Sequence, residues 1–267
     1  SIQGSGKAVV LLHGFLENAQ IWDEYANSLS RKYLVICPDL PGHGNSSNFG
    51  YCHSMEFMAE VVMAILKEHK IRKFHLIGHS MGGTLASLFA GLHPELVSKL
   101  VLMEGVGLWP GMMTGSVLER LSMWMENTRA LAARQPKRYP SLETAFERMH
   151  KANGHLSESQ ARYLTIHGTN QNEDGSYSWK FDNYTHAFPA YRIPEAEMIE
   201  IWRNISAPTL CLNATDGFGH RTGQDGTLDH FARGSLCDIE DAGHWVHHDQ
   251  LEAVVARVDE FLRQPSD

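Results

Sequence analysis

The sequence predicts an α/β fold in which a mostly parallel, doubly wound sheet is interrupted by one long insertion. Two observations support this prediction. Six short apolar runs, rich in β-branched residues, alternate along the chain with segments of helical apolar spacing, and this alternation is typical of βαβ units. Between residue 107 and about residue 196 the alternation stops, and a segment of that length needs structure of its own.

The apolar runs mostly lack the polar–apolar alternation of a strand with one solvated face. We therefore expect the strands of a parallel sheet that is buried on both faces. Strands are expected at 8–12, 33–37, 74–77, 100–103, 209–212 and 235–239, and helices at about 21–29, 55–69, 81–92, 226–231 and 251–262.

The insertion contains Met- and Trp-rich amphipathic pieces, such as Met123-Trp124-Met125, and polar turns. We interpret it as a mainly helical cap over the carboxyl edge of the sheet. The chain then divides into a core of residues 1–106 and 197–267 and a cap of residues 107–196. The Met and Trp side chains of the cap are expected mainly in its hydrophobic core.

A polar stretch inside the cap, Asn170-x-Asn172-x-Asp174-Gly175, is similar to the first half of a calcium-binding loop. The last ligand position of such a loop would be Phe181, where a calcium site needs a carboxylate. We therefore expect a tight turn at Asp174-Gly175 that joins two short strands.

Composition argues against several classes of partner. The chain has 267 residues, with 23 Lys and Arg against 31 Asp and Glu, and its net charge is −8 with the basic residues scattered, so we expect no nucleic-acid partner. The apolar runs are far shorter than the roughly 20 residues that span a bilayer, and no basic-then-apolar leader precedes them, so no membrane partner is expected. The four cysteines lack C-x-x-C spacing, which predicts no disulfides and a cytoplasmic location. The oligomeric state is not predicted.

The strongest catalytic signal is Gly78-His79-Ser80-Met81-Gly82-Gly83, which follows the expected strand at 74–77 and precedes the expected helix at 81–92. This is a G-x-S-x-G pattern in a strand–turn–helix setting, where small flanking residues permit the strained turn that exposes the Ser hydroxyl. The helix N-terminus also favours developing negative charge at this point. We predict that Ser80 is a nucleophile.

A serine hydroxyl needs a base within hydrogen-bond reach. Of the 16 histidines, His244 stands in Asp241-Ala242-Gly243-His244-Trp245, between the last expected strand and the last expected helix. That loop lies at the carboxyl edge beside Ser80, so we predict His244 as the general base. His247 and His248 are expected as solvated residues at the start of the last helix. Without an acidic ligand at fixed helical spacing, the three histidines do not indicate a metal site.

His13-Gly14-Phe15 follows the first expected strand and corresponds in position to an oxyanion-hole loop. We predict that the backbone N–H groups of Phe15 and Met81 form the oxyanion hole. The His13 side chain is expected only to brace this loop. The turn Asp39-Leu40-Pro41-Gly42-His43-Gly44-Asn45-Ser46 is expected to be scaffold, because its Asp and His precede Ser80 in the wrong chain order.

These motifs together resemble the α/β-hydrolase superfamily over essentially the whole chain. The HGF loop, the DLPGHGNS turn, the GHSMGG elbow and the AGHW motif carry the resemblance. Residues 84–267, with the MEGVG, NGHLS and APTL stretches, look more particularly like bacterial relatives of the serine hydrolase-like proteins. The resemblance implies the α/β-hydrolase fold with an inserted cap and a Ser–His–acid triad, but no particular substrate. The superfamily usually opens with an antiparallel strand pair, of which residues 1–7 can supply only a short remnant.

The acid of the triad has two candidates. The superfamily commonly places it a few residues after the strand expected at 209–212, and in Asn213-Ala214-Thr215-Asp216-Gly217 the carboxylate of Asp216 arrives one residue early. Some cap-bearing relatives, including a branch of the haloalkane dehalogenases, instead use a Glu at the end of the strand after the elbow helix, which is Glu104 in this chain. Either carboxylate could hold the imidazole tautomer. We favour Glu104 and keep Asp216 as the alternative.

These residues predict a serine hydrolase that cleaves a small carboxylic ester through an acyl-enzyme, without a metal or another cofactor. Ser rather than Asp at position 80 argues against the dehalogenase and epoxide hydrolase chemistry of this fold. The alternatives are a carbon–carbon bond hydrolase or a cofactor-free lyase or perhydrolase on the same triad, and a ligand receptor that no longer turns over. Trp109, Met112 and Met113 are the expected pocket residues, because adaptable Met side chains suit an acyl site.

Overall fold

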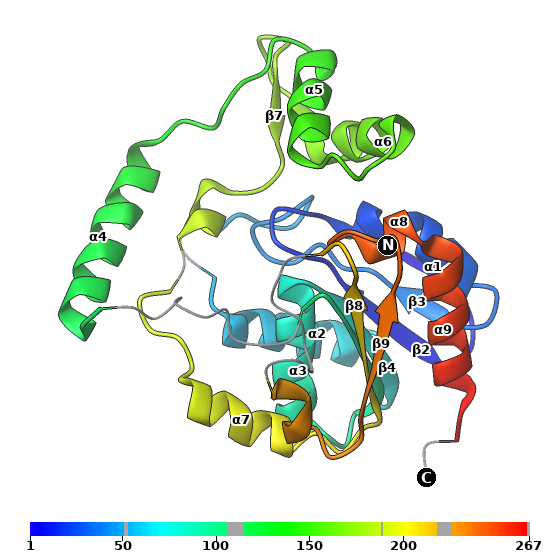
Figure 1. The fold of residues 1–267 in the computed structure, drawn as a ribbon. Helices are drawn as coiled ribbons and strands as arrows, with labels where there is room; N and C mark the ends of the chain where they lie inside the picture. The colour runs from blue at the N-terminus through cyan, green and yellow to red at the C-terminus, as the bar shows by residue number, and fades with distance from the viewer. Residues whose placement is uncertain (51–52, 106–114, 188, 218–225, 266–267) are drawn as a thin grey trace.

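A seven-stranded sheet forms the centre of the computed structural model, which describes residues 1–50, 53–105, 115–187, 189–217 and 226–265. Its strands are β1 (Ile2–Gly4), β2 (Ala8–Leu12), β3 (Leu34–Ile36), β4 (Phe74–His79), β5 (Val97–Met103), β8 (Thr209–Ala214) and β9 (Gly234–Ile239). They lie in the order β1-β3-β2-β4-β5-β8-β9, and all neighbours are parallel except β1, which is antiparallel to β3 (Figure 1). The predicted fold class is confirmed, and β1 is the strand that residues 1–7 contribute to it.

Several strands run further than their apolar segments. β4 continues to His79, β5 begins at Val97 and β8 continues to Ala214. The extensions bury polar residues, some of which find partners, although the Oγ of Ser98 has none within the described part of the chain. Lys99 in β5 is 1% exposed, and its Nζ donates to the carbonyl oxygen of Phe261 at 2.5 Å. A prediction from hydrophobicity ends the strand before such a residue, because buried lysines are rare.

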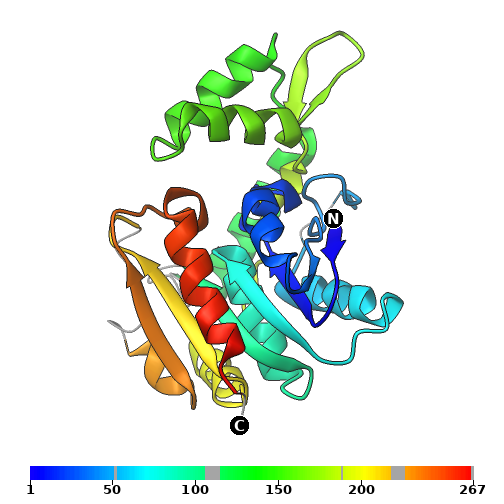
Figure 2. The same cartoon turned by 90° about the vertical axis from the view of Figure 1, so that its right-hand side faces the viewer.

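Helices cover both faces of the sheet. On one face lie α1 (Asp23–Leu29) and α9 (Leu251–Arg263), and on the other lie α2 (Met55–Glu68), α3 (Met81–Leu92) and α7 (Glu195–Arg203); short helical turns are η1 (Ala19–Trp22), η3 (Thr227–His230) and α8 (Val246–Asp249). Figure 2 shows α9 lying across one face. The side chains of β2 alternate between the two cores, with Val9 and Leu11 on the α9 side and Val10 and Leu12 on the α3 side. The central strands β2, β4, β5 and β8 are buried on both faces, as predicted. The prediction is wrong for β9, which lies at the edge of the sheet and is mostly exposed or half-buried.

Two predicted helices differ from the structure. The segment 21–29 begins earlier, as η1 followed by α1, because the Asn18 side chain accepts the N–H of Gln20 at 3.0 Å and starts the turn. The segment 226–231 forms only the single turn η3. Gly226 adopts a left-handed conformation with φ 81° directly before it, and Gly234 opens β9 soon after it, so no room remains for a longer helix.

Between β5 and α7 the chain leaves the sheet and forms α4 (Val117–Ala133), α5 (Leu142–Ala152), α6 (Glu158–Gly168), β6 (Thr169–Gln171), β7 (Tyr177–Trp179) and η2 (Asn183–His186). Ser116, Ser141 and Ser157 begin the three helices by accepting backbone N–H groups of the first turn. Figures 1 and 2 show α5 and α6 beyond one edge of the sheet. These elements fall within the predicted cap, whose limits remain a prediction.

The turn expected at Asp174-Gly175 is confirmed. It joins β6 to the antiparallel β7, and the N–H of Asn172 donates to the carbonyl oxygen of Ser176 at 2.7 Å. Gly175 has φ 80°, a conformation that glycine adopts without steric cost.

α4 contradicts the expectation that the Met and Trp residues of the cap form its core. None of its residues is buried, and Met123 and Met125 are 61% and 46% exposed. Figure 1 shows α4 apart from α5 and α6, so those helices do not cover its apolar side chains. Apolar spacing reports which side chains share a helix face, but not whether another element packs on that face. Within the described ranges, no helix combines the length and apolar character needed to cross a bilayer.

Candidate active site

Ser80 lies in a sharp turn between β4 and α3. Its φ and ψ are 52° and −119°, a strained combination for a residue with a side chain. Its backbone N–H donates to the carbonyl oxygen of Met103 at 2.9 Å. A Cβ on Gly78 would collide with the backbone of Gly82, and one on Gly105 would collide with the backbone of Ser80. Glycine at these positions therefore permits the turn that presents the Ser80 side chain at the carboxyl edge of the sheet.

Glu104 and His244 meet at the same edge. Glu104 directly follows β5, and His244 lies in the loop between β9 and α8. His244 Nδ1 is 3.4 Å from Glu104 Oε2, and the two side chains are only 8% and 5% exposed. The other carboxylate oxygen, Oε1, accepts the N–H of Ala214 at 2.6 Å and so holds the group in place. Ser80, Glu104 and His244 all line one cavity.

The alternative acid, Asp216, lies on an exposed turn after β8. The next residue, Gly217, packs directly against Glu104, because a Cβ on Gly217 would collide with the Glu104 carboxylate. Glu104 thus occupies the space that a side chain at position 217 would need. The geometry favours Glu104 over Asp216 as the partner of His244.

The His13 side chain braces the loop after β2, as expected. It is fully buried, its Nδ1 lies 2.8 Å from the carbonyl oxygen of Gly14, and its Nε2 accepts the N–H of Leu40 at 2.9 Å. Burial lowers the pKa of His13, in keeping with a neutral ring that donates through Nδ1. The turn after β3 is scaffold as well, since the Asp39 carboxylate accepts two backbone N–H groups at 2.7 and 2.8 Å.

The two residues predicted for the oxyanion hole border the same cavity. Phe15 follows the braced loop, and Met81 is the first residue of α3. The N–H groups in the first turn of a helix have no acceptor within the helix, so the amide of Met81 suits a developing oxyanion. Its role, like that of the Phe15 amide, remains a prediction.

A buried ion pair lies behind the elbow. His79, the last residue of β4, is fully buried, and its Nδ1 is 3.4 Å from Glu17 Oε2. Its Nε2 is 2.8 Å from the backbone carbonyl oxygen of His244. A carbonyl oxygen only accepts and a carboxylate faces the other nitrogen, so both ring nitrogens carry protons and His79 is an imidazolium.

The pKa values of the pair agree with this assignment. Burial by itself would lower the pKa of His79, but the charge of Glu17 and hydrogen bonds to Glu17 and His244 outweigh burial and raise it. Burial by itself would raise the pKa of Glu17, but the charge of His79 and the hydrogen bonds to Glu17 outweigh burial and lower it to about 2.

Glu17 also connects two loops and the end of β4. Its Oε2 accepts the N–H of Gly14 at 2.5 Å, and its Oε1 accepts the indole N–H of Trp245 at 2.5 Å. One carboxylate therefore holds the loop after β2, the residue before Ser80 and the loop that carries His244. Sequence reasoning missed this role of Glu17 and His79. In the sequence, an acid after the HGF loop and a histidine inside the elbow are each compatible with solvated side chains. Neither residue by itself therefore indicates a buried ion pair.

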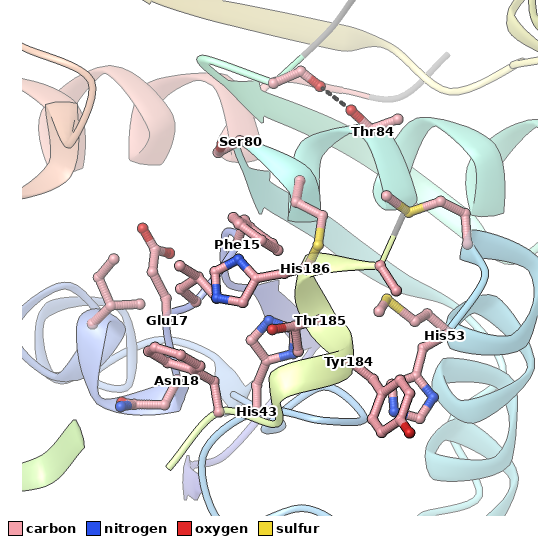
Figure 3. A pocket seen from close by; sticks show the side chains of 18 of the residues that line it. Phe15, Glu17, Asn18, His43, His53, Ser80, Thr84, Tyr184, Thr185 and His186 are labelled. Atoms are coloured by element: carbon pink, nitrogen blue, oxygen red, sulfur yellow. Dashed lines mark hydrogen bonds between the residues drawn. The ribbon is translucent and has the colours of Figure 1, made fainter. Parts of the chain in front are cut away.

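A cavity of about 930 Å³ lies between the sheet edge and the cap, within the size range of small-molecule sites. Figure 3 shows that both parts line it: Ser80 and Phe15 come from the core, and Tyr184, Thr185 and His186 come from η2, with the His186 ring beside that of Phe15. The residues that the sequence predicted for this pocket, Trp109, Met112 and Met113, lie outside the described residues.

The prediction that His247 is solvated is wrong. Its side chain is 1% exposed, and its ring stacks on Trp22 with 4.4 Å between the centroids. The short helix α8 turns His247 toward the core, which a sequence pattern four residues long cannot indicate. Among the residues that the structure describes, no group of three or more His, Cys, Asp or Glu side chains could hold a metal ion.

His244 is suited to accept a proton near neutral pH. Burial lowers its pKa, the hydrogen bond with Glu104 opposes this effect in part, and the charge of His79 lowers the pKa further. The net shift is downward from the ordinary histidine value of 6.5. The ring is therefore mostly neutral at pH 7, with Nδ1 toward Glu104.

Replacing Glu17 with Gln should lower the free energy of unfolding by about 3–5 kcal/mol, because removing one partner of a buried ion pair leaves the other charge uncompensated. Chemical denaturation of wild type, Glu17→Gln and the exposed control Glu60→Gln would measure this effect. A Glu17→Gln variant as stable as the control would contradict the ion pair.

The pH dependence provides a second test of the pair. The contribution of Glu17 is present above its ordinary pKa of 4.5 and is lost as pH falls toward 2. The contribution of His79 is present below its ordinary pKa of 6.5 and is lost as pH rises through its raised value. The stability difference between wild type and Glu17→Gln should therefore be largest between pH 4.5 and 6.5.

Comparison with known proteins agrees with this architecture. The model of the alpha/beta hydrolase fold family matches residues 7–251. A serine hydrolase-like protein of Danio rerio is 26% identical over 272 residues, which cover 98% of this chain and 83% of that protein. An esterase of Mycobacterium tuberculosis is 27% identical over 264 residues, or 94% of this chain and 81% of the esterase. The crystal structure of a hypothetical protein from Pseudomonas aeruginosa superimposes with a TM-score of 0.87 at 25% identity, covering 98% of this chain and 94% of the other. The chain therefore belongs to the alpha/beta hydrolase fold family.

Proposed function

We propose that the chain is a serine hydrolase that cleaves carboxylic esters through an acyl-enzyme. The observation that carries this proposal is the convergence of the strained Ser80 turn and the Glu104–His244 pair on one cavity. The similarity to a mycobacterial esterase over most of both chains supports the reaction class.

In the acylation half of the reaction, Ser80 Oγ attacks the carbonyl carbon of the ester while His244 takes the Ser80 proton. Glu104 accepts the Nδ1–H of His244, which leaves Nε2 to act as the base, and its charge stabilises the imidazolium that forms. The N–H groups of Phe15 and Met81 bind the oxyanion. His244 then donates its proton to the departing alcohol.

Deacylation repeats these steps with water as the nucleophile. His244 takes a proton from water, the hydroxide attacks the acyl carbon, and the carboxylic acid leaves as Ser80 Oγ regains its proton. None of these steps uses a metal or another cofactor. The apolar part of the cavity wall, which includes Met58, Leu88 and Met198, would hold the acyl chain.

Replacing Ser80 with Ala should lower the hydrolysis of short 4-nitrophenyl esters by a factor on the order of 10⁴ to 10⁶, because the nucleophile is removed. The comparison needs Ser28→Ala, a surface variant, as a control for handling and purity. Activity near wild type in Ser80→Ala would end the serine-hydrolase proposal. A single burst of nitrophenol from wild type, without turnover, would instead identify a receptor that is acylated but not hydrolysed.

The rate should rise with pH through one ionisation below 6.5, because His244 must be neutral to accept the Ser80 proton and its pKa is lowered in the fold. At pH 7 the rate should therefore be close to its plateau. A profile of kcat/KM against pH on one 4-nitrophenyl ester would measure this, and a flat profile across the acidic range would argue against His244 as the base.

Glu104→Gln should reduce kcat on the order of 10⁴-fold, as expected when a triad acid becomes its amide and the wrong imidazole tautomer is held. Asp216→Asn should have little effect, since Asp216 is exposed. Both variants are to be assayed on the same ester, with thermal unfolding recorded in parallel to separate catalysis from stability. If Asp216→Asn is the crippled variant and Glu104→Gln stays active, the acid is Asp216.

A further inference from the structure

The cap carries an excess of positive charge beside the cavity. In the segment 134–151 five residues are basic and two are acidic; the basic residues are Arg134, Lys137, Arg138, Arg148 and Lys151, and the acidic ones are Glu143 and Glu147. The chain as a whole has a net charge of −8. This local excess is therefore opposite in sign to the rest of the molecule.

Most of this charge is not neutralised by carboxylates. Glu143 is already bound by the guanidinium of Arg162, with two bonds at 2.7 and 3.0 Å. Arg138 is paired with Asp174 at 2.7 Å. Within the described part of the chain, four cations of the segment have no ion pair: Arg134, Lys137, Arg148 and Lys151.

Three of these cations line the cavity that Ser80 also lines. Arg134, Lys137 and Arg148 line the cavity of about 930 Å³ that also contains Ser80. Lys137 and Arg148 also line an adjoining cavity of about 430 Å³, whose wall includes Lys151. Arg138 and Glu147 line the smaller cavity as well, so its wall holds four cations and one carboxylate, and the two spaces share Lys137 and Arg148.

One contact and one electrostatic effect relate two of these cations to the cavity wall. The Lys137 Nζ lies 5.1 Å from the centroid of the Tyr139 ring, which places a charged amine against a wall that both cavities share. His186, on the η2 wall of the larger cavity, has its pKa lowered by burial and also by the charge of Arg134. The charge of Arg134 is therefore felt inside the cavity.

We propose that Arg134, Lys137, Arg148 and Lys151 form an anion subsite, and that the substrate is a carboxylic ester whose alcohol part carries a phosphate group. This inference rests on the proposed ester hydrolysis. A phosphate monoester has a charge of about −1.5 to −2 at pH 7 and several acceptor oxygens, which matches several cations better than a single carboxylate does. Arginine binds such groups through two parallel N–H bonds.

The position of the subsite assigns the phosphate to the alcohol. Met58, Leu88 and Met198 form an apolar wall on the core side, which suits the acyl chain. The cap side also contributes apolar residues, among them Trp179 and Phe181, but the cations of the cavity wall lie only on that side among the described residues. The cations belong to the cap, so the alcohol would extend from the reacting carbonyl toward them. A local positive field also draws an anionic substrate to a chain that is negative overall.

Three matched esters test the proposal: 1-butyrylglycerol 3-phosphate, the neutral 1-butyrylglycerol, and the butyryl ester of glycerate, which carries a carboxylate. At low salt we expect kcat/KM for the phosphate ester to exceed that for the neutral ester by a factor of about 10, and the advantage should shrink as NaCl rises from about 0.05 to 0.5 M. The carboxylate ester should fall between the two.

The variant Lys137→Gln/Arg148→Gln should bring the ratio of phosphate to neutral ester close to one, mainly through a higher KM for the phosphate ester. Arg129→Gln is the matched control, because Arg129 is an exposed cap cation that lines neither cavity. Both changed residues of the double variant are also exposed, so folding should be retained, and thermal unfolding checks this.

A neutral ester that is cleaved as well as the phosphate ester, or a double variant that keeps the preference, would overturn the subsite. A carboxylate ester that equals the phosphate ester would overturn the assignment to a phosphate. The neutral ester tests the proposed ester hydrolysis separately. If wild type cleaves this ester and Ser80→Ala does not, the proposed hydrolysis stands even when the anion subsite fails.

Discussion

The ion pair between Glu17 and His79 is the interaction on which the geometry of the site depends. Burying two charges is costly unless their attraction and further hydrogen bonds compensate for the lost hydration. Here the carboxylate also accepts the N–H groups of Gly14 and Trp245, and the imidazolium donates to the carbonyl oxygen of His244. Two loops from distant parts of the sequence, the one after β2 and the one after β9, are therefore held against the residue that precedes Ser80. Each of these loops carries a residue that the proposed reaction uses.

The second constraint is the pairing of β5 with β8. These neighbouring parallel strands end at the same edge, so an acid placed after either of them lies close to the loop of His244. Glu104 extends from the end of β5 to the N–H of Ala214 at the end of β8, and Gly217 leaves the space that its carboxylate fills. The carboxylate beside the imidazole is thus supplied from the end of β5, by Glu104. The loop after β8 has a glycine, Gly217, where a side chain would collide with that carboxylate.

The cap and the sheet edge contribute different chemistry to one cavity. The core side supplies the strained serine, the buried imidazole and an apolar wall, whereas the cap side supplies η2 and an excess of cations. The basic residues of the segment 134–151 are already close in the sequence, and α5 and the segment before it place three of them on the cavity wall. α4 has no buried residue, whereas α5 and α6 bury Phe146, Ala161 and Leu164 in the same core cluster as α9.

The sequence by itself determined the sheet and the elbow at Ser80, because buried parallel strands leave continuous apolar runs and because the strained turn needs glycine on both sides. It also indicated the loop of His244, since the order of strands places that loop at the correct edge. Which of Glu104 and Asp216 lies beside the imidazole was decided only by tertiary structure, because both follow strands that end together and only packing against Gly217 separates them. The role of Glu17 and His79 was likewise a tertiary decision: an ion pair between residues 62 positions apart leaves no local pattern, and its energy arises from burial, which a sequence does not display.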